Sequence, residues 1–121
     1  METVVSLSRK NLHKNREPSE KWKFIQKHGR VCKKCGSTDG YNYLLDHIIP
    51  IGVGGDIHNE NNFQILCDRC HGKKSGFDRK IMNELVKKKY MTKGILKIFY
   101  KPIEECIEYY KRRFKELEDE N

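Results

Sequence analysis

The stretch from Cys32 to Lys74 decides the fold and reads CKKCGSTDGYNYLLDHIIPIGVGGDIHNENNFQILCDRCHGKK. It begins with one Cys-x-x-Cys pair, Cys32 and Cys35, and nears its end with a second, Cys67 and Cys70, after 31 intervening residues. Each such turn directs two sulfurs to one point, so the two pairs can hold Zn²⁺ tetrahedrally. The alternative is two unrelated pairs of reduced cysteines. Because four thiolates leave no open position, the pattern predicts a structural zinc ion.

Two short apolar runs lie between the cysteine pairs. Residues 43–49 are rich in branched side chains and stop at Pro50, and residues 63–66 lead directly into Cys67. The connection, residues 51–62, contains three glycines and three asparagines, which is typical of a long loop. The pattern predicts a β-hairpin with a wide loop, then a helix to about residue 75 and another helix capped by Asp78.

The flanks of this stretch predict further helices. Ser19 is a candidate N-cap for a helix that ends at Gly29 and places Trp22 in the core. Residues 91–101 fit either a strand or a buried turn. Pro102 opens a last helix whose apolar residues, Cys106 among them, recur at intervals of three and four. We therefore expect a basic arm at residues 1–18, one domain at residues 19–101, and an amphipathic helix at residues 102–121 that packs on or extends this domain.

Composition bounds the class of protein. The chain has 121 residues, of which 36% are hydrophobic and 35% charged, so it suits one domain with a thin core that metal binding would supplement. The longest apolar stretch, residues 43–53, contains Asp46 and His47 and therefore cannot cross a membrane. The N-terminus has no signal-peptide pattern. We expect a soluble, cytoplasmic protein with no membrane partner, where cysteines serve as metal ligands rather than as disulfides.

Charge is arranged in blocks along the chain, whose net charge is +8. Residues 1–31 carry +5 and residues 72–101 carry +8, whereas residues 32–71 carry −2 and residues 102–121 carry −3. An acidic centre between basic flanks suits a cation site beside a polyanion, because carboxylates bind metal ions while Lys and Arg contact phosphates. A solvated charged surface is the alternative reading of the flanks.

Four polar residues of the hairpin region are not among the predicted zinc ligands. Asp46 and His47 end the first strand, Asn62 precedes the second after 14 residues, and His71 follows after 8 more. An imidazole that titrates near neutrality can take a proton from water, and Asp46 with His71 can offer an oxygen and a nitrogen to one divalent ion. Because neighbours along a strand point to opposite faces, we expect a twist or bulge at Asp46 and His47.

The order of these residues, with Gly54 and Gly55 and both cysteine pairs, resembles the HNH endonucleases over residues 32–74. The resemblance implies an α+β fold of the ββα-metal type, at the centre of an HNH nuclease domain at residues 19–101. It implies hydrolysis of DNA phosphodiester bonds, with His47 as the base that activates water. In the family resembled, Asn62 either holds the loop that orients this base or completes the metal site. The implied cofactors are structural Zn²⁺ and catalytic Mg²⁺ or Mn²⁺ on Asp46 and His71.

Some assignments stay open at this point. His71 can compete with Cys70 as a zinc ligand, although Cys70 completes the Cys-x-x-Cys turn. The alternative function is a non-catalytic, zinc-stabilised module that binds nucleic acid, and a protein-interaction module rests only on the last helix. The expected partner is double-stranded DNA, with a homodimer or a partner nuclease or phage-packaging subunit also possible. Candidate phosphate contacts are the basic residues on the predicted helices after Cys67, each of which could instead be solvated: Arg69, Lys73, Lys74, Lys80, Lys87, Lys88 and Lys89.

Overall fold

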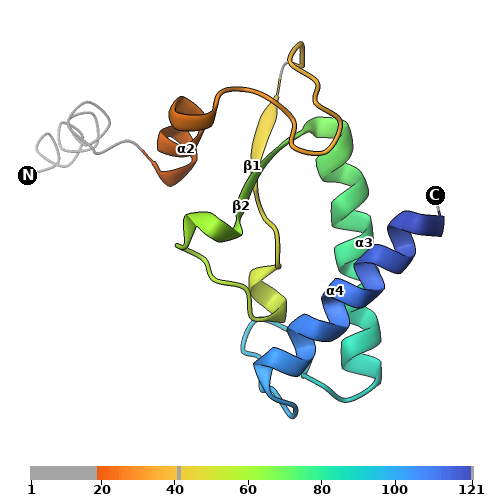
Figure 1. Cartoon of the computed structure of the whole chain (residues 1–121). Coiled ribbons are helices and arrows are strands. Elements are labelled where there is room, and N and C mark those ends of the chain that lie inside the picture. The colour runs from red at the N-terminus through yellow and green to blue at the C-terminus, as the bar shows by residue number, and fades with distance from the viewer. Residues whose placement is uncertain (1–18, 41, 121) are drawn as a thin grey trace, which may run out of the picture.

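A two-stranded antiparallel hairpin lies at the centre of the structure, with a short helix on one side and two long helices on the other (Figure 1). The computed structural model describes residues 19–40 and 42–120, so the arm expected at residues 1–18 lies outside the described residues. The mixed α+β class is confirmed. The elements, in chain order, are α2 (Glu20–His28), β1 (Tyr43–His47), the 3₁₀ turns η1 (Ile51–Val53) and η2 (Glu60–Asn62), β2 (Phe63–Cys67), α3 (Asp68–Lys87) and α4 (Ile103–Glu120).

The hairpin keeps a regular register from one end to the other. Tyr43 pairs with Cys67, and the pairing continues without interruption to Asp46 with Gln64 and His47 with Phe63. The bulge expected at Asp46 and His47 is therefore not formed. Because strand neighbours alternate between faces, the two side chains point to opposite faces of the hairpin.

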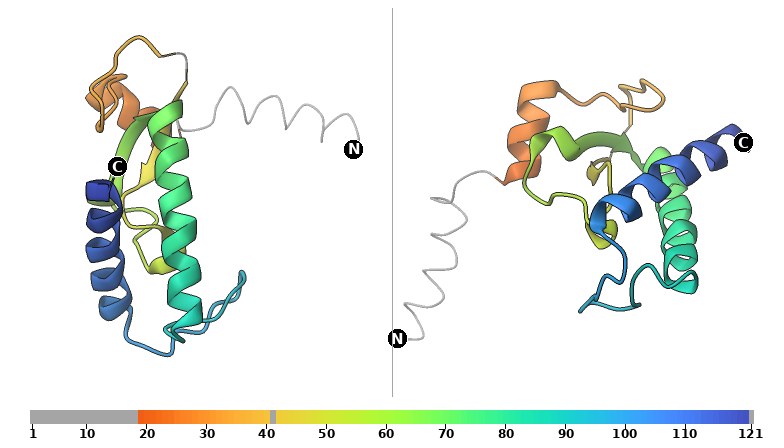
Figure 2. Two further views of the ribbon diagram at one scale, coloured as in Figure 1. Left: turned by 90° about the vertical axis from the view of Figure 1, so that its right-hand side faces the viewer. Right: turned by 60° about the horizontal axis from the view of Figure 1, so that its bottom comes forward.

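Helix α3 is one continuous helix of 20 residues, where the sequence predicted a break before Asp78. The Asp78 side chain caps no helix, because it accepts hydrogen bonds from Lys74 and from the Tyr110 hydroxyl of α4. Helix α4 runs back antiparallel along α3, as the left view of Figure 2 shows. The two helices enclose the larger apolar cluster, whose buried members are Val53, Ile81, Leu85, Met91, Cys106, Tyr109, Tyr110 and Leu117.

A second, smaller cluster connects α2 to the hairpin and the cysteine pairs. Helix α2 is capped by the Ser19 hydroxyl and ends at Gly29, as its sequence predicted. It buries Ile25 against the hairpin, whereas Trp22 is 44% exposed, so the prediction that Trp22 lies in the core is wrong. The cause is the rotation of α2, which turns Phe24 and Ile25 toward the hairpin, with the Phe24 ring 5.6 Å from that of Phe63.

The segment between α3 and α4 is irregular. Its one described pairing is an isolated bridge between Met91, which is buried, and Phe99. Ile95 and Leu96 at its tip are 98% and 91% exposed, so this segment is neither a regular strand nor a buried turn. Among the described helices, none carries an apolar run of membrane-spanning length.

Candidate functional site

The four cysteines of the two Cys-x-x-Cys pairs meet at one end of the hairpin. All four Sγ atoms lie within 4.8 Å of one another, and those of Cys35 and Cys67 are 3.8 Å apart. Tetrahedral zinc with Zn–S bonds of ~2.3 Å separates its sulfurs by about 3.8 Å, so the donor set fits Zn²⁺. The predicted four-cysteine cluster is confirmed, and His71 is not part of it.

The surroundings of Cys32 and Cys70 shift the pKa values of these two thiols in opposite directions. Burial opposes ionisation of Cys32, but N–H groups of the neighbouring backbone outweigh it and lower the pKa of Cys32 to about 6. Burial and the adjacent sulfurs raise the pKa of Cys70 to about 12. Because thiolates so close together repel one another, a bound divalent cation is what allows all four to ionise.

Asp46 is buried on the face of the hairpin that α3 covers. Its Oδ2 atom accepts one hydrogen bond from the Gln64 amide at 2.8 Å and is 2.9 Å from the Lys74 ammonium. Its Oδ1 atom lies 3.9 Å from Nε2 of His71, on the first turn of α3. Two donors of one octahedral ion with bonds of ~2.1 Å lie between about 3.0 and 4.2 Å apart, so Asp46 and His71 fit a shared divalent ion.

The His47 ring lies on the opposite face of the hairpin. Its Nε2 atom is 3.0 Å from the carbonyl oxygen of Ile57, and its ring centre is 5.3 Å from that of Phe63 in an edge-on arrangement. A carbonyl oxygen can only accept, so Nε2 carries the hydrogen. In the neutral ring this leaves the lone pair on Nδ1, which is the form that a general base requires.

Asn62 connects both ends of the hairpin loop. Its Oδ1 accepts from the backbone N–H of Ile49 at 2.8 Å, and its Nδ2 donates to the carbonyl oxygens of Ile49 and Asp56 at 3.0 and 2.9 Å. Gly55 is required beside it, since a Cβ there would lie 1.9 Å from the Ile49 oxygen. The three hydrogen bonds of the Asn62 side chain therefore hold the hairpin loop together. The same loop carries the Ile57 carbonyl that contacts His47.

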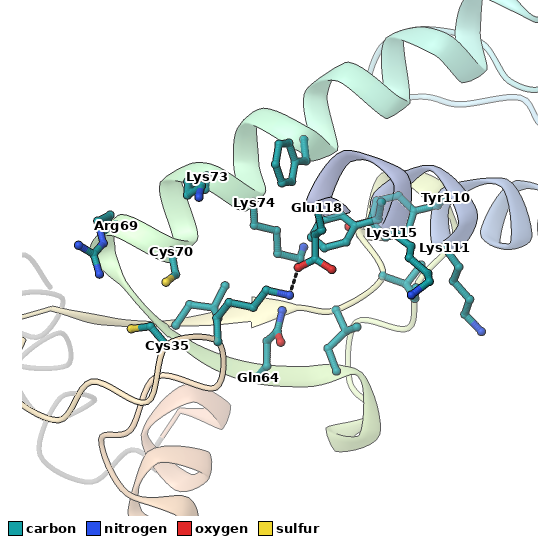
Figure 3. Close-up of a pocket in the computed structure, with 16 residues that line it drawn as sticks. Cys35, Gln64, Arg69, Cys70, Lys73, Lys74, Tyr110, Lys111, Lys115 and Glu118 are labelled. Atoms are coloured by element: carbon teal, nitrogen blue, oxygen red, sulfur yellow. Dashed lines mark ion pairs between the residues drawn. The ribbon is translucent and has the colours of Figure 1, made fainter. Parts of the chain in front are cut away.

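A cleft of about 840 Å³ opens beside Asp46, between the hairpin, the first half of α3 and the second half of α4 (Figure 3). Gln64 and Lys74, which contact Asp46, also line this cleft. Its floor includes apolar side chains such as Leu66 and Phe77. An ion pair between Lys34 and Glu118 crosses it, drawn as the dashed line in Figure 3. The basic residues that line it come from three separate segments: Lys34, Arg69, Lys73, Lys74, Lys111 and Lys115.

The sequence-predicted basic residues divide into three groups. Arg69 and Lys73 are exposed at the cleft, next to the candidate site. Lys80 and the run Lys87, Lys88 and Lys89 are exposed on the distal half of α3 or just after it. Lys74 also lines the cleft but is only 6% exposed and bonds to protein acceptors, which sets it apart from the other candidate phosphate contacts. Its neighbour in sequence, Lys73, points to solvent because successive helix positions are rotated by about 100°.

Sequence reasoning missed the residues that reach the site from α4 and from the cysteine turn. Lys34 and Lys111 line the cleft because α4 packs antiparallel along α3 (Figure 2), beside the turn that carries Lys34. Tyr110 lies on the buried side of α4, but its hydroxyl bonds to Asp78. Burial and this hydrogen bond raise the pKa of Tyr110, so the phenol remains a donor. For Tyr110 and Lys111 the only signal was the helical periodicity of α4, which does not reveal what a helix packs against.

Comparison with known proteins gives one match. Residues 32–77 match the family model described as HNH endonuclease, and this range includes the hairpin, both cysteine pairs and the first half of α3. No curated protein and no solved structure matches the chain significantly. The matched range contains the zinc-type cluster together with Asp46, His47, Asn62 and His71. Residues 32–77 of this chain therefore carry a match to the HNH endonuclease family model.

Proposed function

We propose that this protein is a metal-dependent HNH endonuclease that hydrolyses phosphodiester bonds of double-stranded DNA. The observation that carries the proposal is the hydrogen bond that fixes the tautomer of the His47 ring. Its Nε2 is engaged by the Ile57 carbonyl, so Nδ1 is free to accept a proton.

In the proposed reaction, the phosphate lies at the end of β1, where the Asp46 face and the His47 face of the hairpin meet, and Nδ1 of His47 takes a proton from a water molecule as the water oxygen attacks phosphorus. The bond from phosphorus to the 3′ oxygen breaks, the departing 3′ oxygen takes a proton from solvent water to become a hydroxyl, and the other product ends in a 5′-phosphate. Asn62 acts through the loop, because its three hydrogen bonds hold the segment that presents the Ile57 carbonyl to His47.

Asp46 and His71 would hold the catalytic Mg²⁺ or Mn²⁺. When bound, such an ion supplies positive charge that stabilises the phosphate and the departing oxygen. Two protein ligands leave the remaining positions open to water and phosphate oxygens and bind a hard cation loosely. The zinc ion of the four cysteines would have a structural role, since its coordination is complete.

The cleft supports DNA as the partner. Arg69 and Lys73 lie at its edge with Lys111 and Lys115 across it, so a phosphate backbone that reaches Asp46 would pass between basic side chains. HNH nucleases act on DNA, which agrees with this arrangement. Glu118, paired with Lys34, is the acidic exception in the cleft lining.

The test compares His47→Ala with His58→Ala in a plasmid-cleavage assay with Mg²⁺ or Mn²⁺. His58 lies in the same loop region, is exposed, and pairs with Glu20 at 3.1 Å, so it is a matched control. Losing a positioned general base should slow cleavage by about 10² to 10⁴-fold, and His58→Ala should cleave like the unmodified protein. Chelator should abolish cleavage in all of them, and added Mg²⁺ or Mn²⁺ should restore it in the unmodified protein.

One observation favours the alternative, a zinc-stabilised module that binds nucleic acid without cutting it. Lys74 already neutralises Asp46, so the carboxylate has a cationic partner without any divalent ion. If His47→Ala cleaves as fast as the unmodified protein, or if none of the proteins cleaves with either ion, the binding module becomes the better interpretation.

A further inference from the structure

We propose that Lys74 is a built-in counter-cation of Asp46 that competes with the divalent ion and sets how tightly the site binds it. This inference rests on the proposed function, because it takes Asp46 and His71 as the ligands of that ion. It assigns Lys74 a role in ion binding although the residue is not itself a ligand.

The burial of Lys74 is the first observation. Among residues 19–40 and 42–120, Asp46 and Lys74 are the only charged side chains that are buried, with exposures of 8% and 6%. They are also each other's partners, at 2.9 Å. A lysine kept from water needs anionic or carbonyl acceptors, because an unpaired buried ammonium is strongly unfavourable. The pair therefore depends on both members in the protein without a divalent ion.

The second observation is that the two carboxylate oxygens of Asp46 have different contacts. Oδ2 is taken by Gln64 and Lys74, whereas Oδ1 is the oxygen that faces His71. A divalent ion on Oδ1 would lie only a few ångströms from the Lys74 ammonium, because both cations would share the one carboxylate of Asp46. Two like charges at that separation repel, so the ammonium must weaken ion binding even as it orients the carboxylate.

The third observation is that the Lys74 ammonium has acceptors other than Asp46. Its ammonium is also 2.8 Å from Oδ2 of Asp78, one helical turn later, and 3.0 Å from the carbonyl oxygen of His47. The other Asp78 oxygen accepts the Tyr110 hydroxyl of α4. Asp78 can therefore keep the ammonium paired when a divalent ion binds Asp46. The Asp78 carboxylate is held in place by α4, which lies outside the matched HNH range.

The arrangement explains how the fold can tolerate an ion that exchanges readily. Without a divalent ion, Lys74 neutralises Asp46 and keeps the hairpin and α3 together. With the ion present, its positive charge near Asp46 lowers the affinity, so the ion is not trapped. Stability without the ion and affinity for the ion should therefore change in opposite directions when Lys74 is altered.

The experiment titrates Mn²⁺ into the zinc-loaded protein by calorimetry and measures melting temperature with and without Mn²⁺. Lys74→Met removes the charge and keeps much of the side-chain volume. It should bind Mn²⁺ at least about tenfold more tightly, melt at a lower temperature without Mn²⁺, and recover more of its melting temperature on adding it. Lys73→Met makes the same charge change one residue away on the exposed side, and should alter Mn²⁺ affinity by less than about twofold.

Asp78→Asn tests the same idea with the opposite sign and remains available if Lys74→Met does not fold. It leaves the ammonium with Asp46 as its one carboxylate partner, so Mn²⁺ affinity should fall by about tenfold. If Lys74→Met binds Mn²⁺ more weakly or equally, or if Asp78→Asn leaves the affinity unchanged, the counter-cation role is wrong.

Asp46→Asn distinguishes failure of this inference from failure of the proposed function. If Asp46→Asn abolishes Mn²⁺ binding while Lys74→Met leaves it unchanged, the ion site stands and only the role of Lys74 is lost. If Asp46→Asn leaves Mn²⁺ binding intact, the ion is not held by Asp46, and both the proposed site and the inference fail.

Discussion

The two ends of this molecule are stabilised in different ways. At the cysteine end, the small cluster around Ile25, Cys32 and Ile65 surrounds four thiols that fit a metal ion. At the other end, α3 and α4 enclose a larger apolar cluster and are connected by polar bridges, such as Arg113 to Glu84 at 2.8 Å. That contact with Arg113 lowers the pKa of Glu84. One end depends on ligand spacing, the other on long-range packing, and the candidate catalytic residues lie where the two meet.

The largest expected effect comes from breaking the cysteine end. Cys32→Ser removes one thiolate from a closed site whose apparent zinc affinity in small domains is worth about 10 to 16 kcal/mol, much of it folding energy. We expect the purified protein to carry one zinc ion per chain by elemental analysis, and Cys32→Ser to lose that ion together with the part of the melting transition that comes from the cysteine end. Cys106→Ser is the control, since Cys106 lies in the other cluster, away from the four thiols.

A chain that contains no zinc, and a Cys32→Ser variant that melts unchanged, would show that the cysteine end is stabilised by its apolar contacts alone.

A smaller effect is expected from breaking the packed end. Leu85 of α3 is completely buried against α4, so Leu85→Ala should lower the free energy of unfolding by about 2 to 5 kcal/mol while zinc content stays the same. Leu96→Ala makes the same change at a side chain that is 91% exposed and should lower it by less than about 0.5 kcal/mol. Denaturant unfolding measures both. Loss of zinc from Leu85→Ala would show that the two ends fold as a single unit.

The difference between the two ends also explains what the sequence could predict. The cysteine spacing, the hairpin and α2 follow from local signals, such as the Ser19 cap and the loop glycines, and the structure agrees with them. The prediction that Trp22 lies in the core was wrong because periodicity in a nine-residue helix does not decide which side is buried. The predicted helix break before Asp78 was wrong for a related reason. The Asp78 side chain, expected to cap a helix, instead accepts a hydrogen bond from Tyr110 of α4, 32 residues away.

The candidate site divides in the same way. Asp46, His47, Asn62 and His71 could be named from their order in the sequence. Their distribution over two faces of the hairpin, and the burial of Lys74, could not, because both depend on the register and on the rotation of α3. Adjacent lysines look equivalent in a sequence, yet Lys73 is exposed and Lys74 is buried.

The smallest expected effect asks whether DNA contacts both ends. The pair Arg69 and Lys73 lies at the cleft beside the candidate site, whereas Lys87 lies 16 residues beyond His71 on the same helix, about 24 Å along its axis. We expect Arg69→Gln with Lys73→Gln to weaken binding to all DNA sequences alike and to flatten the slope of log affinity against log salt by about 2, near one unit per phosphate contact.

The matched double variant, Lys87→Gln with Lys88→Gln, removes the same charge from the distal end of α3. Both variants are measured in the His47→Ala protein, so that binding is recorded without cleavage. A slope reduced by the first pair alone means that DNA stays near the cleft. Equal reductions mean that the duplex runs along α3 over both ends, as the sequence-based assignment of Lys80, Lys87, Lys88 and Lys89 requires. If neither pair alters the slope, these side chains are solvated charges, because every neutralised phosphate must release counterions and leave its mark on the salt dependence.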